Sequence, residues 1–129
     1  MNLQALLEKV QNSPEFLQLI SLVNQSSNNK IFLSNLQGSS TELLIAAMFN
    51  FEQLKPVNHL IVLNDAEEAA YFHNSLEGLT NALDLFYFPS SFKNRKNFQL
   101  LNSSHVMLRT EALTRLSAGG NKKILVTYP

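Results

Sequence analysis

Short apolar runs alternate with helix-length segments along most of this chain, and this alternation limits the fold more than any other feature. Continuous apolar strands separated by helices are typical of parallel sheets, because each crossover helix covers a face of the sheet. The pattern predicts strands at residues 31–33, 59–63, 85–88 and 124–127. It therefore indicates an α/β domain with a mostly parallel sheet and helices on both faces.

The helices are predicted from apolar residues spaced three and four apart, and from proline and glycine at their ends. Two helices precede the first strand, one within residues 1–10 and one that begins at Pro14, after the N-cap residue Ser13, and runs to about Val23. Three more are expected at 41–53, 65–79 and 106–118, the last ending at Gly119-Gly120. Residues 90–104 are polar and are predicted to form an ordered surface loop.

The length of 129 residues corresponds to one domain, and 45% hydrophobic residues are enough for a packed core. The sequence ends directly after the last predicted strand, so we expect 1–129 to be a single α/β domain truncated from a larger multidomain protein. There is no cysteine, no signal-peptide core, and no apolar run near the roughly 18 residues of a membrane span. We expect a cytoplasmic location and no membrane partner.

The segment between the first predicted strand and its helix is where a phosphate-binding loop belongs. A working loop has the pattern G-x-x-x-x-G-K-[ST], whose lysine contacts phosphates and whose hydroxyl binds Mg²⁺. When Gly38 is aligned with the glycine often found inside such loops, Asn35 and Ser40 occupy the two glycine positions, Thr41 the lysine position and Glu42 the hydroxyl position. The layout is that of a P-loop, RecA-like, helicase-type domain with a degenerate phosphate loop, and no cofactor is expected.

Two energetic terms oppose nucleotide binding at this loop. Loss of the lysine removes a charge-assisted contact of about 1.5–3 kcal/mol. The Glu42 carboxylate adds about 1–4 kcal/mol of repulsion toward a phosphate at 4 Å. Together they lower the affinity by about a hundred-fold to a hundred-thousand-fold. Locally, an ordinary Ser/Gly turn, with Ser40 or Thr41 as the helix N-cap, accounts for the same residues.

The remaining polar residues do not form an enzyme site. Asp65 follows an apolar run like a Walker B acid, but with Glu68 three residues later it matches a capping box better. Arg109 and Arg115 are expected to be solvated. The histidines have no metal-binding spacing, and no serine has a credible base, so neither a catalytic residue nor a metal ligand is assigned.

One basic cluster stands out, formed by Lys93, Arg95 and Lys96. It is a candidate for contact with a phosphate or an acidic partner, and the alternative is a solvated loop. Ten basic residues balance ten acidic ones over the whole chain. DNA binding by this chain is therefore expected to be weak or absent.

Five segments resemble those of a known family: residues 33–40, 63–69, 85–92, 109–113 and 124–129. Through them, and nearly end to end, the chain resembles the N-terminal UvrB-like module of bacterial transcription-repair coupling factors, in their Bacteroidetes branch. That family consists of large DNA-translocating ATPases that release stalled RNA polymerase and recruit nucleotide-excision repair. Its N-terminal region is similar to the helicase UvrB but lacks the ATPase motifs, which agrees with Asn35, Ser40, Thr41 and Glu42.

The resemblance implies a non-catalytic scaffold and regulatory module. Its partners would be other domains of the same protein and, through the whole protein, UvrA and RNA polymerase. Two other interpretations remain open: a functional helicase-type nucleotide-binding domain with an atypical P-loop, and an unrelated flavodoxin-like domain.

Overall fold

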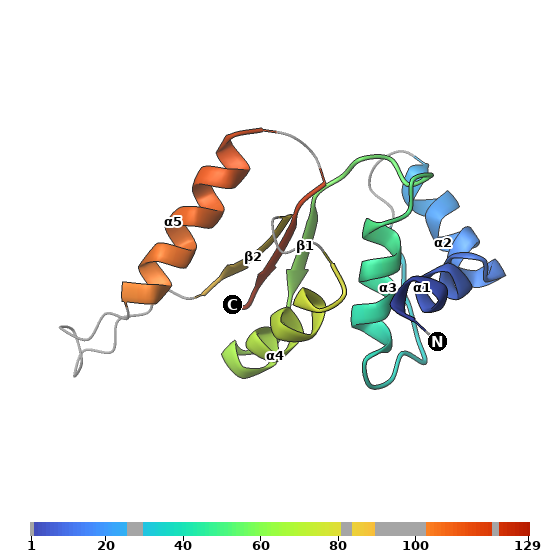
Figure 1. Cartoon of the computed structure of the whole chain (residues 1–129), viewed down its shortest axis with the longest axis horizontal. Helices are drawn as coiled ribbons and strands as arrows, with labels where there is room; N and C mark the ends of the chain where they lie inside the picture. Colours follow the sequence, from blue (N-terminus) through green and yellow to red (C-terminus); the bar gives the residue numbers. More distant parts are fainter. Residues whose placement is uncertain (1, 26–29, 81–83, 90–102, 120–121) are drawn as a thin grey trace.

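The computed structural model describes residues 2–25, 30–80, 84–89, 103–119 and 122–129. Within them the chain forms five α-helices and three β-strands (Figure 1). In chain order these are α1 (Leu3–Gln11), α2 (Pro14–Asn24), α3 (Ser40–Phe49), β1 (His59–Val62), α4 (Ala66–Glu77), β2 (Leu85–Phe88), α5 (Ser103–Ser117) and β3 (Ile124–Thr127).

The three strands form a parallel sheet in the order β1-β3-β2, so the strand that is last in sequence lies in the middle. Ile124 is in register with His59 on one side and with Leu85 on the other. Parallel neighbours joined through intervening helices are the arrangement that the strand–helix alternation predicts. The α/β class and the parallel sheet are thus confirmed.

The prediction of a first strand at residues 31–33 was wrong. This segment has no regular secondary structure and does not join the sheet, and Phe32 is 91% exposed. Leu33 is also exposed, whereas Ile31 packs against the core. A strand is stabilised by its ladder partners and its packed side chains, and three residues with one inward side chain provide little of either.

Helices cover both faces of β2. Leu85 and Tyr87 belong to the main core, which also contains the apolar face of α4. Phe86 and Phe88 alternate with them and therefore point to the opposite face. There the guanidinium carbon of Arg109 on α5 lies 4.1 Å from the Phe88 ring centroid. The outer face of β1 differs, because Leu60 and Val62 are 64% and 58% exposed.

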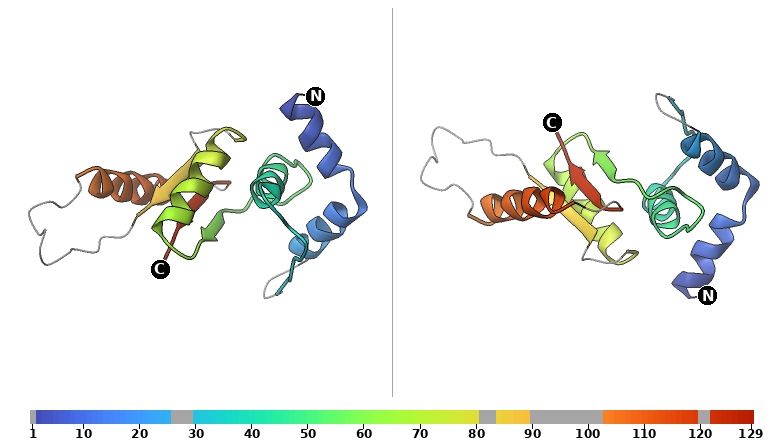
Figure 2. Two further views of the ribbon diagram at one scale, coloured as in Figure 1. Left: turned by 90° about the horizontal axis from the view of Figure 1, so that it is seen from below. Right: turned by 90° about the horizontal axis from the view of Figure 1, so that it is seen from above.

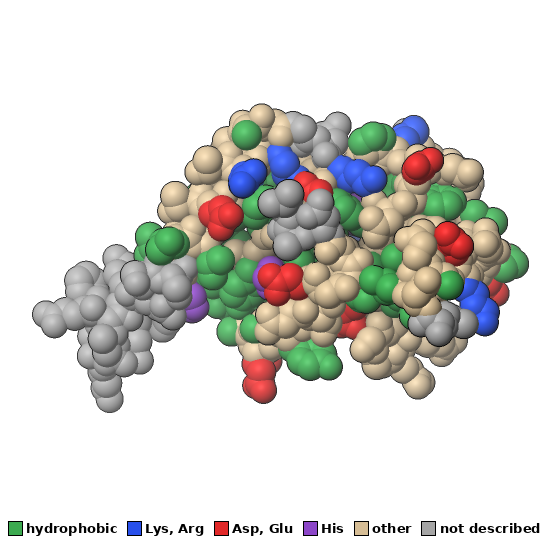
Figure 3. All heavy atoms as spheres, in the orientation of Figure 1, with side chains coloured by type: hydrophobic (Ala, Val, Ile, Leu, Met, Phe, Trp, Pro, Cys, Tyr) green, Lys and Arg blue, Asp and Glu red, His purple; other side chains and the backbone are tan. Residues whose placement is uncertain are grey.

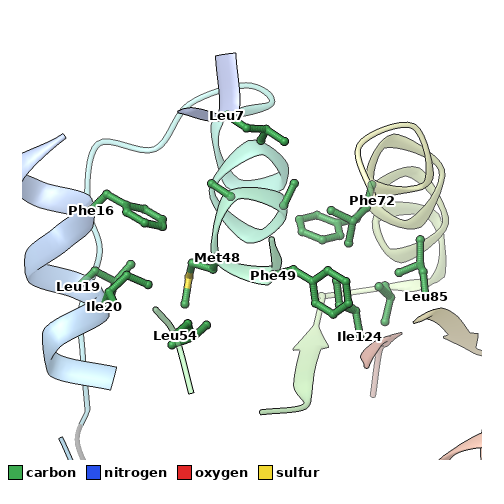
Figure 4. Packing of buried hydrophobic residues seen from close by; sticks show 14 of the residues in the cluster. Leu7, Phe16, Leu19, Ile20, Met48, Phe49, Leu54, Phe72, Leu85 and Ile124 are labelled. Carbon is green, nitrogen blue, oxygen red and sulfur yellow. The ribbon is translucent and has the colours of Figure 1, made fainter. Parts of the chain in front are cut away.

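Helices α1 and α2 pack on α3, at the end of the molecule away from α5 (Figures 1 and 2). The Phe16 ring meets the Phe51 ring edge-on, with centroids 5.1 Å apart. The Gln11 side-chain amide donates to the Ala47 carbonyl at 3.0 Å. Figure 4 shows the core continuing from α2 through α3 to α4 and the sheet. Its buried residues include Leu7, Phe16, Leu19, Ile20, Ala46, Ala47, Met48, Phe49, Leu54, Phe72, Leu76, Ile124 and Val126.

The predicted helix ends agree with the structure where a local signal fixes them. The Phe16 N–H donates to Ser13 Oγ at 3.3 Å, and Pro14 is the first helical residue of α2. Gly119 has a φ of +81°, the left-handed conformation that follows a helix end, just after α5. Helix α3 is shorter than predicted, because it ends at Phe49 and a turn at Phe51–Leu54 follows.

None of the helices in the described ranges is both long enough and apolar enough to span a bilayer.

Candidate functional site

The degenerate phosphate loop forms an exposed turn that leads into α3. Asn35 and Gly38 both have left-handed backbone, with φ values of +65° and +57°. The Ser40 N–H and hydroxyl both donate to the Gln37 carbonyl, at 3.1 and 2.5 Å. The N-cap is Ser39, whose side chain makes no capping hydrogen bond, so neither Ser40 nor Thr41 is the cap that a simple Ser/Gly turn predicts.

The residue at the Mg²⁺-binding hydroxyl position is buried. Glu42 lies in the first turn of α3, is only 6% exposed, and its Oε2 atom has no hydrogen-bond partner among the residues that the structure describes. Thr41, at the lysine position, is half-buried and carries no charge. The first turn of α3 therefore has an uncharged threonine and a buried acid where a working loop has a lysine and a Mg²⁺-binding hydroxyl.

A second helix, α4, begins at the end of the sheet where the strands finish, and it is acidic as well. Asp65 is its N-cap and accepts the Glu68 N–H at 2.8 Å, while Glu68 Oε2 accepts the Asn64 N–H at 3.1 Å. The capping interpretation of Asp65 and Glu68 is thus confirmed, although the return bond reaches Asn64 instead of the cap residue itself. Glu67 adds a further carboxylate to this turn. In open α/β sheets ligands bind outside the carboxyl ends of the strands, and here that end disfavours anions.

The predicted basic contacts have different outcomes. Lys93, Arg95 and Lys96 lie outside the described residues. The expectation that Arg109 is solvated was wrong. Its Nη1 donates to the Pro89 carbonyl at 2.7 Å, and its guanidinium lies over the Phe88 ring. These contacts join α5 to the end of β2. Arg115 is exposed, as expected.

A cavity of about 230 Å³ lies at the other end of the sheet, where β1 begins. It is bounded by the end of α3, the segment that follows it, His59 and Lys122, and we call it the His59 cavity. The His59 ring stands edge-on to Phe49, with centroids 6.0 Å apart, and the Lys122 ammonium lies 5.4 Å from the Phe49 ring centroid. Sequence reasoning missed this site, since its walls come from segments far apart in the chain.

His59 is unusual within this cavity. Both ring nitrogens are buried, and neither has a hydrogen-bonding partner in the described part of the chain. Burial lowers the pKa of His59 below its usual 6.5, a weak hydrogen-bonding contact with the Val57 backbone raises it, and the charge of Lys122 lowers it further. The imidazole is therefore mainly neutral at pH 7, and both of its nitrogens are closed off from the cavity.

No protein-family model, no curated protein and no solved structure matches this chain. The two ends of the sheet differ in their chemistry. At the carboxyl end, carboxylates occupy the first turns of both α3 and α4. At the opposite end, a lysine and a neutral histidine border an apolar cavity. The first arrangement disfavours a nucleotide phosphate.

Proposed function

We propose that this chain is the non-catalytic, UvrB-like N-terminal module of a transcription-repair coupling factor, with a P-loop, RecA-like ancestry and a phosphate loop that no longer binds nucleotide. The observation that carries the proposal is the burial of Glu42 in the first turn of α3, directly after the uncharged Thr41. An acid at this position repels a nucleotide phosphate and replaces the Ser or Thr hydroxyl that binds Mg²⁺ in a working loop.

The parallel sheet and its connecting helices support the proposal. The units from β1 to β3 alternate strand and helix and place β3 centrally, as an open α/β sheet does. The structure does not support a strand before the phosphate loop, because residues 31–33 lie outside the sheet. The proposal rests on the loop chemistry, on the α/β scaffold and on the family resemblance of the five segments.

In this role the module acts through contact and not through chemistry. It supports the neighbouring domains of the parent protein and helps to hold the resting protein closed, while ATP hydrolysis, the release of RNA polymerase and the recruitment of UvrA belong to the whole protein. The sequence encoded downstream of Pro129 is the first test. We expect it to continue into further UvrB-like domains and a translocase with an intact phosphate loop; an unrelated continuation overturns the assignment.

A deletion in the intact parent protein tests the proposed role directly. Removing residues 1–129 should leave its ATPase activity in place and raise the basal rate, because catalysis lies elsewhere and a restraint is lost. The matched control is the full protein with Lys9→Gln, an exposed change on α1 that should keep the basal rate. Loss of ATPase activity on deletion, with the rest of the protein still folded, would show that the module takes part in catalysis.

A further inference from the structure

Strand β1 forms an unprotected edge of the sheet. Among the residues that the structure describes, β1 pairs with β3 alone, and the apolar residues 31–33 do not join the sheet. Soluble proteins usually protect an edge strand with lysine, proline or a bulge, because its unpaired backbone attracts other strands. Residues 59–62 contain no lysine, arginine, acid or proline, and both Leu60 and Val62 are largely exposed. The edge is therefore open to pairing.

The hydrogen bonds of β1 show which backbone groups face this edge. The N–H groups of His59 and Leu63 donate to carbonyls at the two ends of β3, at 2.7 and 2.9 Å. In a parallel strand the N–H and C=O of one residue point to the same side, and those of the next residue point to the other. Leu60 and Val62 therefore direct two N–H and two C=O groups away from β3. An extended segment of another chain supplies the complementary groups.

The two ends of the edge carry opposite charges. Lys55 and Lys122 are exposed and line the same cavity as His59, the first residue of β1. Asp65 and Glu67 are exposed in the turn that begins α4, just after β1 ends. Lysine and arginine side chains gather along the upper middle of Figure 3, near where β1 begins in Figure 1, and acidic side chains lie lower, beside α4. A partner with the reverse polarity is complementary to this edge.

We propose that the open edge of β1 binds an extended, apolar peptide segment of another protein, which adds a further strand to the sheet. The segment carries an acidic residue beside the amino end of β1 and a basic residue beside its carboxyl end. Backbone hydrogen bonds to Leu60 and Val62 hold it, and its apolar side chains pack beside theirs on the outer face. This inference is independent of the proposed function.

Two capped heptapeptides are the probes for this edge. Glu-Thr-Val-Ile-Val-Thr-Lys matches the charges as a parallel strand, and Lys-Thr-Val-Ile-Val-Thr-Glu matches them as an antiparallel strand. Titrated into the ¹⁵N-labelled 129-residue chain, one of the two should give saturable amide shifts centred on Leu60 and Val62, with a dissociation constant of about 0.1–1 mM. Absence of saturable shifts with both peptides overturns the proposal.

Hydrogen exchange tests the backbone pairing itself. The amide protons of Leu60 and Val62 should exchange rapidly in the free chain and slow down when the peptide is bound. The Ile61 amide faces β3 and should be protected in both states. The same peptide with proline in place of its central isoleucine lacks a ladder donor and should not bind. Equal binding of the proline peptide, or unchanged exchange at Leu60 and Val62, contradicts the proposal.

A pair of lysine variants locates the site. Leu60→Lys should weaken peptide binding by roughly threefold to tenfold, because it places a charge among the apolar side chains of the edge. Leu17→Lys makes the same change at an exposed position of α2 and should bind like the unaltered chain. Equal affinity in the two variants contradicts the proposal. Sedimentation without peptide should show a monomer, and a dimer that Leu60→Lys abolishes would assign the edge to a second copy of the chain instead.

Discussion

Replacing Glu42 with methionine should stabilise the protein. The substitution keeps the length of the side chain and removes a carboxylate that is 6% exposed and whose Oε2 has no partner in the described residues. An unsatisfied buried polar atom costs about 1–3 kcal/mol, and more when it is charged. A carboxylate in the first turn of a helix gains only about 0.3–1 kcal/mol from the helix dipole. The difference favours methionine by about 0–3 kcal/mol, with a central value of about 1.4 kcal/mol.

Urea unfolding followed by circular dichroism measures this gain. The midpoint should rise at an unchanged slope, and the melting temperature should rise by roughly 3–8 °C for a domain of this size. Glu67→Met is the matched control, because Glu67 also lies in the first turn of a helix but is exposed. Glu67→Met should not raise the urea midpoint and should lower it slightly. Destabilisation by Glu42→Met of more than about 1 kcal/mol would refute the reasoning, since it would mean that the carboxylate is well satisfied.

Three further outcomes are expected. Asp65→Ala removes the N-cap of α4 and should lower the free energy of unfolding by about 0.5–2 kcal/mol, and an unchanged urea midpoint would contradict the capping role. Because the pKa of His59 is lowered in the folded state, the unfolded chain takes up the proton first, so stability should be complete above about pH 6.5 and fall as the pH decreases. The contribution of the half-buried His59 to stability should change by less than about 1.4 kcal/mol per pH unit. His59→Gln should therefore reduce the slope of the urea midpoint against pH. Equal slopes in the variant and the unaltered chain would show that His59 does not contribute to the pH dependence. Because the chain has zero net charge, fluorescence anisotropy at physiological salt should detect only weak, salt-sensitive DNA binding, and nanomolar affinity would contradict this prediction.

The parts of the fold that were predicted from the sequence are those with local causes. Ser13 and Pro14 begin α2, and Asp65 with Glu68 begins α4, because a helix cap involves residues only three or four apart. The strands at β1, β2 and β3 were located within a residue, since each is an apolar run between polar or proline residues. For these helix ends and strands, the structure that the local sequence favours is also the one found in the fold.

The failures involve partners that are far apart in the chain. Residues 31–33 have a strand-like composition, but whether they pair depends on a neighbouring strand that composition does not reveal. The contact of Arg109 was missed because its acceptor, the Pro89 carbonyl, lies 20 residues away in the chain. The His59 cavity brings Phe49, His59 and Lys122 together through the fold alone. No local pattern in the sequence points to it.

The most direct test of the central claim is a calorimetric titration of the 129-residue chain with Mg-ATP. The replacement of the signature lysine by Thr41 and the buried acid at Glu42 predict no heat of binding up to millimolar nucleotide. A dissociation constant in the low micromolar range would contradict the claim, because it would show that the phosphate loop still binds its nucleotide.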